Sequence, residues 1–248
     1  MRERLYDGAL ALHKRLGYWL GQGFGGRHTL RAEAGAARRF LPSSGAIILD
    51  VGAHRGEWSR ALLDIAGPQL ASIYAFEPAP ENHDFIRKIA DPRLELVPLA
   101  ASDNPGQLVL YSHVSGASIS SVYRRKLDHY GMEFDKERPV ECTTVDAFLS
   151  ERNIERVDFL KLDVEGHEMK VLEGAQKSLT SGKIRALSFE FGGCNIDSRT
   201  YLRDFWFFLD DLGFAIYIIN PLSGIHAIEK YHERQESFLT TNYIAVQS

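Results

Sequence analysis

The densest cluster of side chains suited to acid–base chemistry is the segment DVEGHE at residues 163–168, with three acids and one histidine. It follows the apolar run 157–162, where buried charged groups cost stability unless they have partners. Some of these acids could simply cap the next helix, because carboxylates suit a helix N-terminus. We assign function to Asp163 and Glu165, at the strand end and in the turn. His167 is the next candidate base because its reference pKa is near neutral, with an ordinary exposed helix histidine as the alternative.

A second segment, DVGAHRG at residues 50–56, has glycines spaced for a tight turn against a ligand. Gly52 and Gly56 let the backbone turn sharply and approach a ligand closely. Asp50 can face the positive end of that ligand, directly or through water. A turn without a ligand is the alternative for this segment alone. The residues expected to contact a cofactor here are Asp50, Gly52, Ala53, His54 and Gly56.

The glycine spacing separates two classes of cofactor. A nicotinamide cofactor would normally be bound by GxGxxG after the first strand. This segment reads D-x-G-x-x-x-G and lacks the middle glycine of that fingerprint. The chain also has no GxxxxGK loop followed by Ser or Thr, so a P-loop NTPase is a poor match. A ligand without phosphates, such as S-adenosylmethionine (SAM), fits this spacing better.

Two further acids follow the next two predicted strands. Glu77 comes 25 residues after Gly52, and a carboxylate at this place can accept hydrogen bonds from both ribose hydroxyls. Ser102 and Asp103 leave the third strand, where a carboxylate can accept from an adenine amino group. The sequence SDNPG is also rich in turn formers, so a plain turn is the alternative. Asp163, after the fourth strand, is expected to contact the cofactor as well.

The elements that position these residues are strands alternating with amphipathic helices. This pattern predicts an α/β fold with a doubly wound, mostly parallel seven-stranded sheet, Rossmann-like, whose ligands bind at the carboxyl ends of the strands. Glu190 ends the fifth strand at that edge and is the fourth candidate catalytic residue. No helix pattern separates the last two strands, so we expect an antiparallel pair at the sheet edge. The predicted strands are 46–52, 72–78, 94–103, 157–166, 184–191, 215–220 and 238–248.

Two regions depart from the alternation. Residues 1–44 are predicted to be a helical extension, with an amphipathic helix over 1–20 and a glycine-rich loop, preceding a cofactor-binding domain at 45–248. We expect residues 1–30 to help cover the acceptor site, with a helix docked for stability or dimerisation as the alternative. An insertion at 104–145 is expected to contain strands at 107–114 and 138–145. Three of its serines could hydrogen-bond a sugar-like acceptor, with a flexible polar loop as the alternative: Ser118, Ser120 and Ser121.

Composition excludes several classes of partner. The chain has 248 residues and a net charge of −4, which gives no electrostatic reason to expect nucleic acid or an anionic membrane. Its two cysteines, Cys142 and Cys194, form no CxxC pair, so neither a disulfide framework nor a zinc site is expected, and we predict no metal. No apolar run is long enough for a membrane span, and the N-terminus does not read as a signal peptide. We therefore expect a cytoplasmic protein, and its composition is compatible with a homo-oligomer.

Four segments resemble the FkbM-type SAM-dependent methyltransferases, namely ILDVGAHRGEWS, YAFEPAPEN, LAASDNPG and VDFLKLDVEGHEMKVLEGA. The resemblance spans about residues 45–190 and implies a class I methyltransferase that O-methylates a hydroxyl, often on a sugar or a natural product. It implies SAM contacts at the positions of Asp50, Gly52, Glu77 and Asp103. His54 stands where such loops often have Asn. The position of His167 varies among similar proteins, which favours Asp163 and Glu165.

Three other functions compete with a small-molecule O-methyltransferase. A SAM-binding module without catalysis would bind SAM and turn over no acceptor. A nicotinamide-dependent oxidoreductase would bind NAD(H) instead of SAM. A metal-dependent catechol-type methyltransferase would use the acids after the fourth strand, although the family resemblance implies no required metal.

Overall fold

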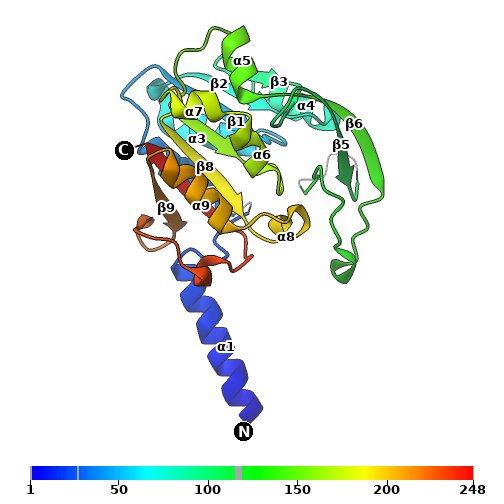
Figure 1. Cartoon of the computed structure of the whole chain (residues 1–248), viewed down its shortest axis with the longest axis vertical. Helices are drawn as coiled ribbons and strands as arrows, with labels where there is room; N and C mark the ends of the chain where they lie inside the picture. The colour runs from blue at the N-terminus through cyan, green and yellow to red at the C-terminus, as the bar shows by residue number, and fades with distance from the viewer. Residues whose placement is uncertain (1, 27, 115–118, 248) are drawn as a thin grey trace.

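A central eight-stranded sheet organises the protein (Figure 1). The computed structural model describes residues 2–26, 28–114 and 119–247. The strand order is β10-β9-β11-β8-β7-β1-β2-β3, and the five strands from β8 to β3 are parallel. The strands are β1 (Ala46–Val51), β2 (Leu70–Phe76), β3 (Leu94–Val97), β7 (Phe159–Leu162), β8 (Ala186–Phe191), β9 (Phe214–Asn220), β10 (Gly224–Ile228) and β11 (Thr241–Gln247).

The large sheet has one strand more than the seven predicted from the sequence. The last two predicted strands do pair antiparallel, but β11 lies between β8 and β9, and the edge belongs to β10. The five residues of β10 include no fully buried side chain, so the sequence there lacks the apolar run that marks a core strand.

Helices cover both faces of the sheet. On one face, α2 (Leu30–Arg38) and α3 (Glu57–Ala66) pack on residues such as Ile48 and Phe159. The other face of β1 points Leu49 and Val51 toward a second group of helices. These are α5 (Val145–Glu151), α6 (Glu168–Glu173), α7 (Gln176–Thr180) and α9 (Leu202–Asp211).

The insertion forms a second, smaller sheet. Its strands β5 (Gly106–Ser112) and β6 (Lys136–Thr143) confirm the two strands predicted in this region. The predicted strand 94–103 is split, because β3 stays in the large sheet while β4 (Ala100–Ala101) pairs with β6. Pro98 lies at the break, where a residue without a backbone N–H cannot continue the ladder.

The remaining elements are the N-terminal helix and the short helices that connect other elements. The predicted N-terminal helix is confirmed as α1 (Arg2–Trp19), but it projects away from the body (Figure 1). Within the described ranges, none of the helices combines the length and the apolarity needed to cross a bilayer. The others are α4 (Pro80–Arg87), α8 (Cys194–Ser198), and the 3-10 helices η1 (Gly67–Gln69), η2 (Asp128–Tyr130) and η3 (Glu233–Gln235).

Candidate active site

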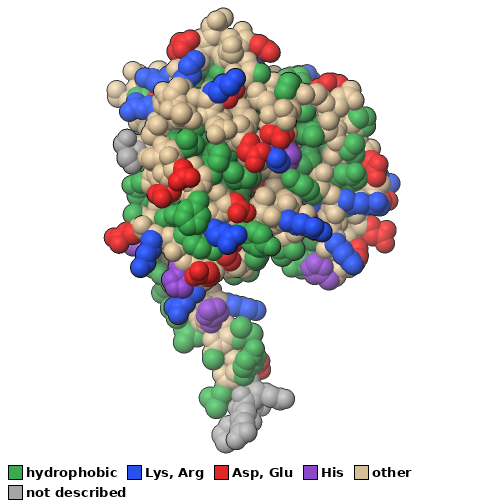
Figure 2. All heavy atoms as spheres, in the orientation of Figure 1, with side chains coloured by type: hydrophobic (Ala, Val, Ile, Leu, Met, Phe, Trp, Pro, Cys, Tyr) green, Lys and Arg blue, Asp and Glu red, His purple; other side chains and the backbone are tan. Residues whose placement is uncertain are grey.

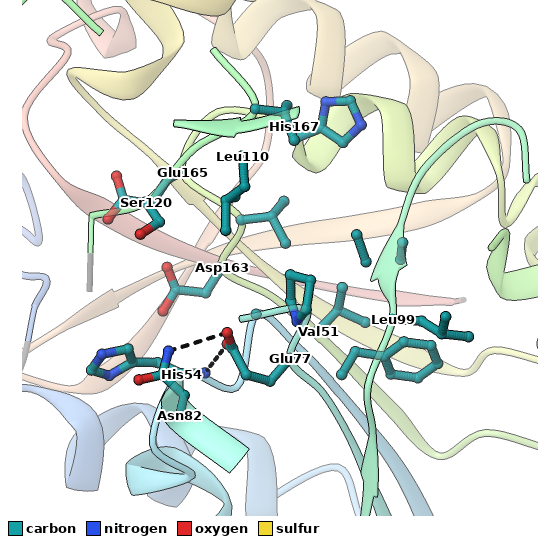
Figure 3. A pocket seen from close by; sticks show the side chains of 17 residues that line it. Val51, His54, Glu77, Asn82, Leu99, Leu110, Ser120, Asp163, Glu165 and His167 are labelled. Carbon is teal, nitrogen blue, oxygen red and sulfur yellow. Dashed lines mark hydrogen bonds between the residues drawn. The ribbon is translucent and has the colours of Figure 1, made fainter. Parts of the chain in front are cut away.

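Two adjoining hollows open at the carboxyl ends of the parallel strands. The first, called the slot, lies between the ends of β1, β2 and β7 and the small sheet (Figure 3). The second, called the wide cavity, has a volume of about 860 Å³. The slot and the wide cavity share four lining residues, which are Gly52, His54, Asp163 and Glu165.

The turn after β1 packs directly against the end of β7. Gly52 has φ +85°, and a Cβ atom added there would lie 1.9 Å from the Asp163 carbonyl oxygen. No other residue type fits this contact, because it combines a left-handed backbone with a steric clash. Gly56 also has positive φ and precedes α3. Ala53 and His54, between the two glycines, line the wide cavity.

Glu77 is buried in the slot with its carboxylate held by three donors. Its Oε2 atom accepts from the His54 backbone N–H (2.8 Å), and Oε1 accepts from the Ala79 N–H (2.9 Å) and the Asn82 Nδ2 (3.1 Å). Burial raises the pKa of Glu77 to about 7, although these three bonds oppose the rise. Figure 3 shows Glu77 at the base of the slot beside Asn82.

Asn82 is a slot residue that the sequence analysis missed. Its Oδ1 atom is buried without a hydrogen-bond partner among the described residues. Burying an amide oxygen without a partner costs free energy, so a hydroxyl donor in the slot would complete it. Its only signal in the sequence is its position in the first turn of α4, five residues after Glu77.

Asp50 lies beneath both hollows and lines neither. The carboxylate is fully buried, and its Oδ2 accepts from the Ser59 hydroxyl at 2.6 Å. Its Oδ1 lies 3.6 Å from the Nζ of Lys161, which faces it across the β1–β7 pair. The structure therefore connects Asp50 to the wide cavity through Lys161, where the sequence analysis expected Asp50 to face the ligand.

Lys161 is a buried cation that the sequence analysis also missed. Its Nζ lies 3.0 Å from Asp163 Oδ2 and 5.7 Å from the Trp58 ring centre. Burial disfavours its charge, but the charges of Asp163, Asp50 and Glu33 outweigh burial and raise the pKa of Lys161. Asp163 is consequently a fixed, charge-compensated carboxylate where the slot meets the wide cavity.

Glu165 and Glu190 are two further acids that line the wide cavity, which also contains Glu33, Glu57 and Asp197. Glu165 has φ +54° and is paired with Arg125 Nη1 at 2.5 Å, while Arg125 Nε lies 3.5 Å from Asp197. Burial, reinforced by Asp163, raises the pKa of Glu165 to about 8. Glu190 has no ion pair within the described part of the chain, and burial next to Asp163 and Glu165 raises its pKa well above the usual range.

Oxygen atoms of Glu165 and Glu190 and the Sγ of Cys194 lie within 4.8 Å of one another. Two carboxylates and a thiolate are a donor set that a divalent cation can use. However, Arg125 already supplies a positive charge to Glu165, and burial raises the pKa of the Cys194 thiol so that it stays protonated. We therefore assign no metal to this cluster.

His167 lines the slot and does not line the wide cavity. Its Nε2 lies 2.9 Å from the Ser102 hydroxyl and its Nδ1 lies 3.3 Å from the Tyr123 hydroxyl. Burial lowers the pKa of His167 to about 4. The ring is thus held neutral between two hydroxyls, away from the wide cavity and its acids.

Asp103 lies outside both hollows and pairs with Lys170 at 3.2 Å.

The serines predicted to bind the acceptor have other positions. Ser118 lies outside the described residues. Ser120 lines the slot, and Ser121 is fully buried. The Ser121 hydroxyl donates to the Glu165 carbonyl at 2.7 Å, which fixes the turn of residues 163–166 against the small sheet. Among the described serines of this stretch, none lines the wide cavity.

The slot fits the adenosyl part of SAM. Its walls include Phe76, Pro78, Leu99 and Val164, which offer apolar surface for an adenine ring. Glu77 lies in the slot, where the sequence analysis predicted a carboxylate for the ribose hydroxyls, and this role stays a prediction. No cluster of cations that would pair with a pyrophosphate lines the slot among the described residues.

Comparisons with known proteins agree with this geometry. The family model described as "Methyltransferase FkbM domain" matches residues 50–216. The chain is 30% identical over 145 residues to the 2-O-methyltransferase NoeI of Sinorhizobium fredii (strain NBRC 101917 / NGR234), covering 54% of this chain and 59% of that protein. The crystal structure of methyltransferase FkbM from Methylobacillus flagellatus KT superposes with a TM-score of 0.51 at 16% identity.

That superposition covers 82% of this chain and 44% of the other, so it supports the fold alone. The chain spans less than two thirds of the length of both relatives. The family match, by contrast, covers well over half of the chain and includes the turn after β1, Glu77 and the segment 163–168. SAM is the cofactor of this family, in agreement with the slot. The chain belongs to the FkbM methyltransferase family.

Proposed function

We propose that the protein transfers the methyl group of SAM to a hydroxyl of a sugar, a glycan or a similar small molecule bound in the wide cavity. The observation that carries this proposal is the junction of the two hollows. A cofactor slot and an acid-lined cavity meet at Gly52, His54, Asp163 and Glu165. The similarity to a protein named as a 2-O-methyltransferase favours oxygen as the acceptor atom.

Residues of the slot would hold the cofactor by its neutral groups. Glu77 and the unpartnered Asn82 Oδ1 would accept from the ribose hydroxyls, and Pro78 and Leu99 would contact the adenine. The turn at Gly52 would leave the rest of the molecule at the junction with the wide cavity. When bound, SAM supplies an electrophilic methyl group on a positively charged sulfur.

Three acids of the wide cavity divide into two kinds by their partners. Asp163 is held by Lys161, so it can orient the acceptor hydroxyl as a fixed hydrogen-bond acceptor. The carboxyl groups of Glu165 and Glu190 lie within 4.8 Å of each other. Two carboxyl groups this close disfavour double ionisation, which raises the apparent pKa of the pair toward that of a useful base. We assign removal of the hydroxyl proton to this pair.

The test is mass spectrometry of reactions containing isotopically labelled SAM and a panel of glycans and hydroxylated metabolites. We expect a labelled methyl group on a hydroxyl of at least one acceptor. Glu190→Gln is expected to remove most of this transfer while SAM binding persists. Binding of SAM without transfer to any acceptor would instead support a non-catalytic SAM-binding module, and binding of NAD(H) without SAM would support an oxidoreductase.

A further inference from the structure

The helix α1 carries an apolar face that no other described part of the protein covers. Leu5, Leu12, Leu16 and Trp19 recur at helical spacing and are 68%, 58%, 50% and 49% exposed. Figure 2 shows apolar side chains, in green, on the projecting helix below the body of the protein. Leaving so many large apolar groups in water is unfavourable, and a large exposed apolar patch commonly marks an interaction site.

The width of this face distinguishes between two kinds of partner. Tyr6, Leu10 and Leu20 are also exposed and lie beside the first stripe on the helical wheel. Together the two rows cover about half of the helix circumference at 3.6 residues per turn. A coiled-coil seam is narrower, because only two positions per heptad face the partner helix. A broad apolar face suits a flat apolar phase better than a second helix.

The charge of the helix points to the same partner. The segment 2–19 has four Lys or Arg and two Asp or Glu, whereas the whole chain has a net charge of −4. Pairing this helix with a second copy of itself would bring two positively charged segments together. An amphipathic helix with Lys and Arg on its polar face and Leu and Trp on the other is typical of one that lies on an anionic bilayer.

The chain leads directly from α1 to residues that line the wide cavity. The chain continues from Trp19 past Gly23, which lies against Leu239, to the cavity-lining Gly26 and Leu30. Three other residues that line the wide cavity have highly exposed apolar side chains, namely Tyr130, Ile196 and Leu239. The apolar surface of α1 therefore leads toward the rim of the wide cavity.

We propose that α1 docks on an anionic lipid surface, with its apolar face in the interfacial region and its basic residues toward the headgroups. A bilayer under α1 would lie beside the rim of the wide cavity. An acceptor with a hydroxylated head and a lipid tail could then enter the cavity from that surface, a consequence that rests on the proposed function. The docking itself does not depend on methyl transfer.

The test is co-sedimentation of the full chain with vesicles of phosphatidylcholine, either pure or mixed with phosphatidylglycerol. The double variant Leu12→Glu/Leu16→Glu places charge on the apolar face. The matched control is Val109→Glu on β5, which is 40% exposed and belongs to neither hollow. SAM binding by both variants checks that the slot is intact.

We expect the native chain to bind the mixed vesicles, and to bind them less well as salt is added. The double variant should bind at least about tenfold less well, whereas the Val109→Glu control should bind as the native chain does. Absence of binding, equal binding to pure phosphatidylcholine, or binding unchanged by the double substitution would overturn the proposal. A dimer in sedimentation velocity that the double substitution dissolves would assign the face to a second copy and overturn it too.

Discussion

The slot and the wide cavity are built in different ways. The slot is made mostly at the ends of β1, β2 and β7 and from the strand β4, and its key carboxylate, Glu77, is satisfied largely by nearby backbone and Asn82. The wide cavity gathers segments far apart in the chain, including 30–33, 119–130, 193–197 and 238–240. Among its acids, Glu165 pairs with Arg125, which is 40 residues away. The comparison indicates that the cofactor end is set by local turn geometry and the acceptor end by long-range packing.

The largest effect is expected from breaking the turn that joins the two regions. Gly52→Ala would place a Cβ atom 1.9 Å from the Asp163 carbonyl oxygen, so the ends of β1 and β7 must separate. We expect loss of detectable SAM binding by calorimetry and a lower melting temperature. Gly45→Ala is the matched control, since Gly45 also has positive φ but a Cβ atom added there would meet no described atom within 4 Å.

Gly45→Ala should cost about 1–2 kcal/mol of unfolding free energy from its left-handed backbone and leave SAM affinity unchanged. Equal losses of SAM affinity in the two variants would show that backbone strain, and not the contact with Asp163, explains the effect. A circular dichroism spectrum would confirm that Gly52→Ala is still folded.

The next largest effect concerns the acids of the wide cavity. Asp163→Asn and Glu190→Gln keep side-chain size and remove charge, and each is expected to slow turnover by about 10²–10⁴-fold. Calorimetry should find SAM affinity changed far less than turnover in both. Glu95→Gln is the control, because Glu95 forms an exposed ion pair with Arg152 away from both hollows. Unchanged turnover in both cavity variants would remove these acids from the mechanism.

A pH profile of turnover tests the assignment of Glu165 and Glu190 as the base. A base works only when it is deprotonated, and the pKa of Glu165 is raised to about 8 with that of Glu190 also raised. Turnover should therefore increase as the pH rises through about 8, and the profile of Glu190→Gln should lose or shift this increase. A profile that is flat from pH 6 to 9 under conditions where chemistry limits the rate would contradict the assignment of proton removal to Glu165 and Glu190.

A smaller effect is expected at the ribose end of the slot. Removing a hydrogen bond to a charged group costs about 1.5–3 kcal/mol, so Glu77→Ala should weaken SAM binding by roughly 10–150-fold. Because the pKa of Glu77 is about 7, native affinity should also fall as the pH drops below that value and the carboxylate gains a proton. A folded Glu77→Ala protein with native affinity would exclude the ribose assignment.

The smallest expected effect is on stability and involves His167. Its folded pKa of about 4 lies below the unfolded value of about 6.5, so the unfolded chain binds more protons between these values. The His167 contribution to stability is complete above pH 6.5 and is lost as the pH falls toward 4. His167→Gln should lose less stability than the native chain over this window, by roughly 1–3 kcal/mol. His226→Gln, at an exposed position, is the control.

Much of the slot could be predicted because its signals are local in sequence. The glycine spacing at 52 and 56, the acid at 77 and the alternation of strands and helices each depend on neighbouring residues. The role of Lys161 was not predicted because it depends on the strand register that places Lys161 opposite Asp50. The sequence of one strand does not determine its register with a neighbouring strand. Arg125 and the observed partner of Ser121 were not predicted for a related reason, since both residues contact Glu165, 40 and 44 residues away.

The orientation of the His167 ring could not be predicted from its residue type and its neighbours in the sequence. Its residue type and its place among acids made it a candidate base, but the first turn of α6 directs the ring toward Ser102 and Tyr123. The direction of a side chain at a helix start depends on backbone angles and packing. The strand β10 also depends on its surroundings. Its short, half-exposed sequence has no apolar run, and it forms a strand by pairing with β9.

The division between slot and wide cavity is tested most directly by a crystal structure with S-adenosylhomocysteine. We predict the adenine between Pro78 and Leu99, the ribose hydroxyls within hydrogen-bond distance of Glu77 and Asn82, and the sulfur at the junction beside Gly52. An adenosyl group bound in the wide cavity, with Glu77 making no contact to the ribose, would contradict the account.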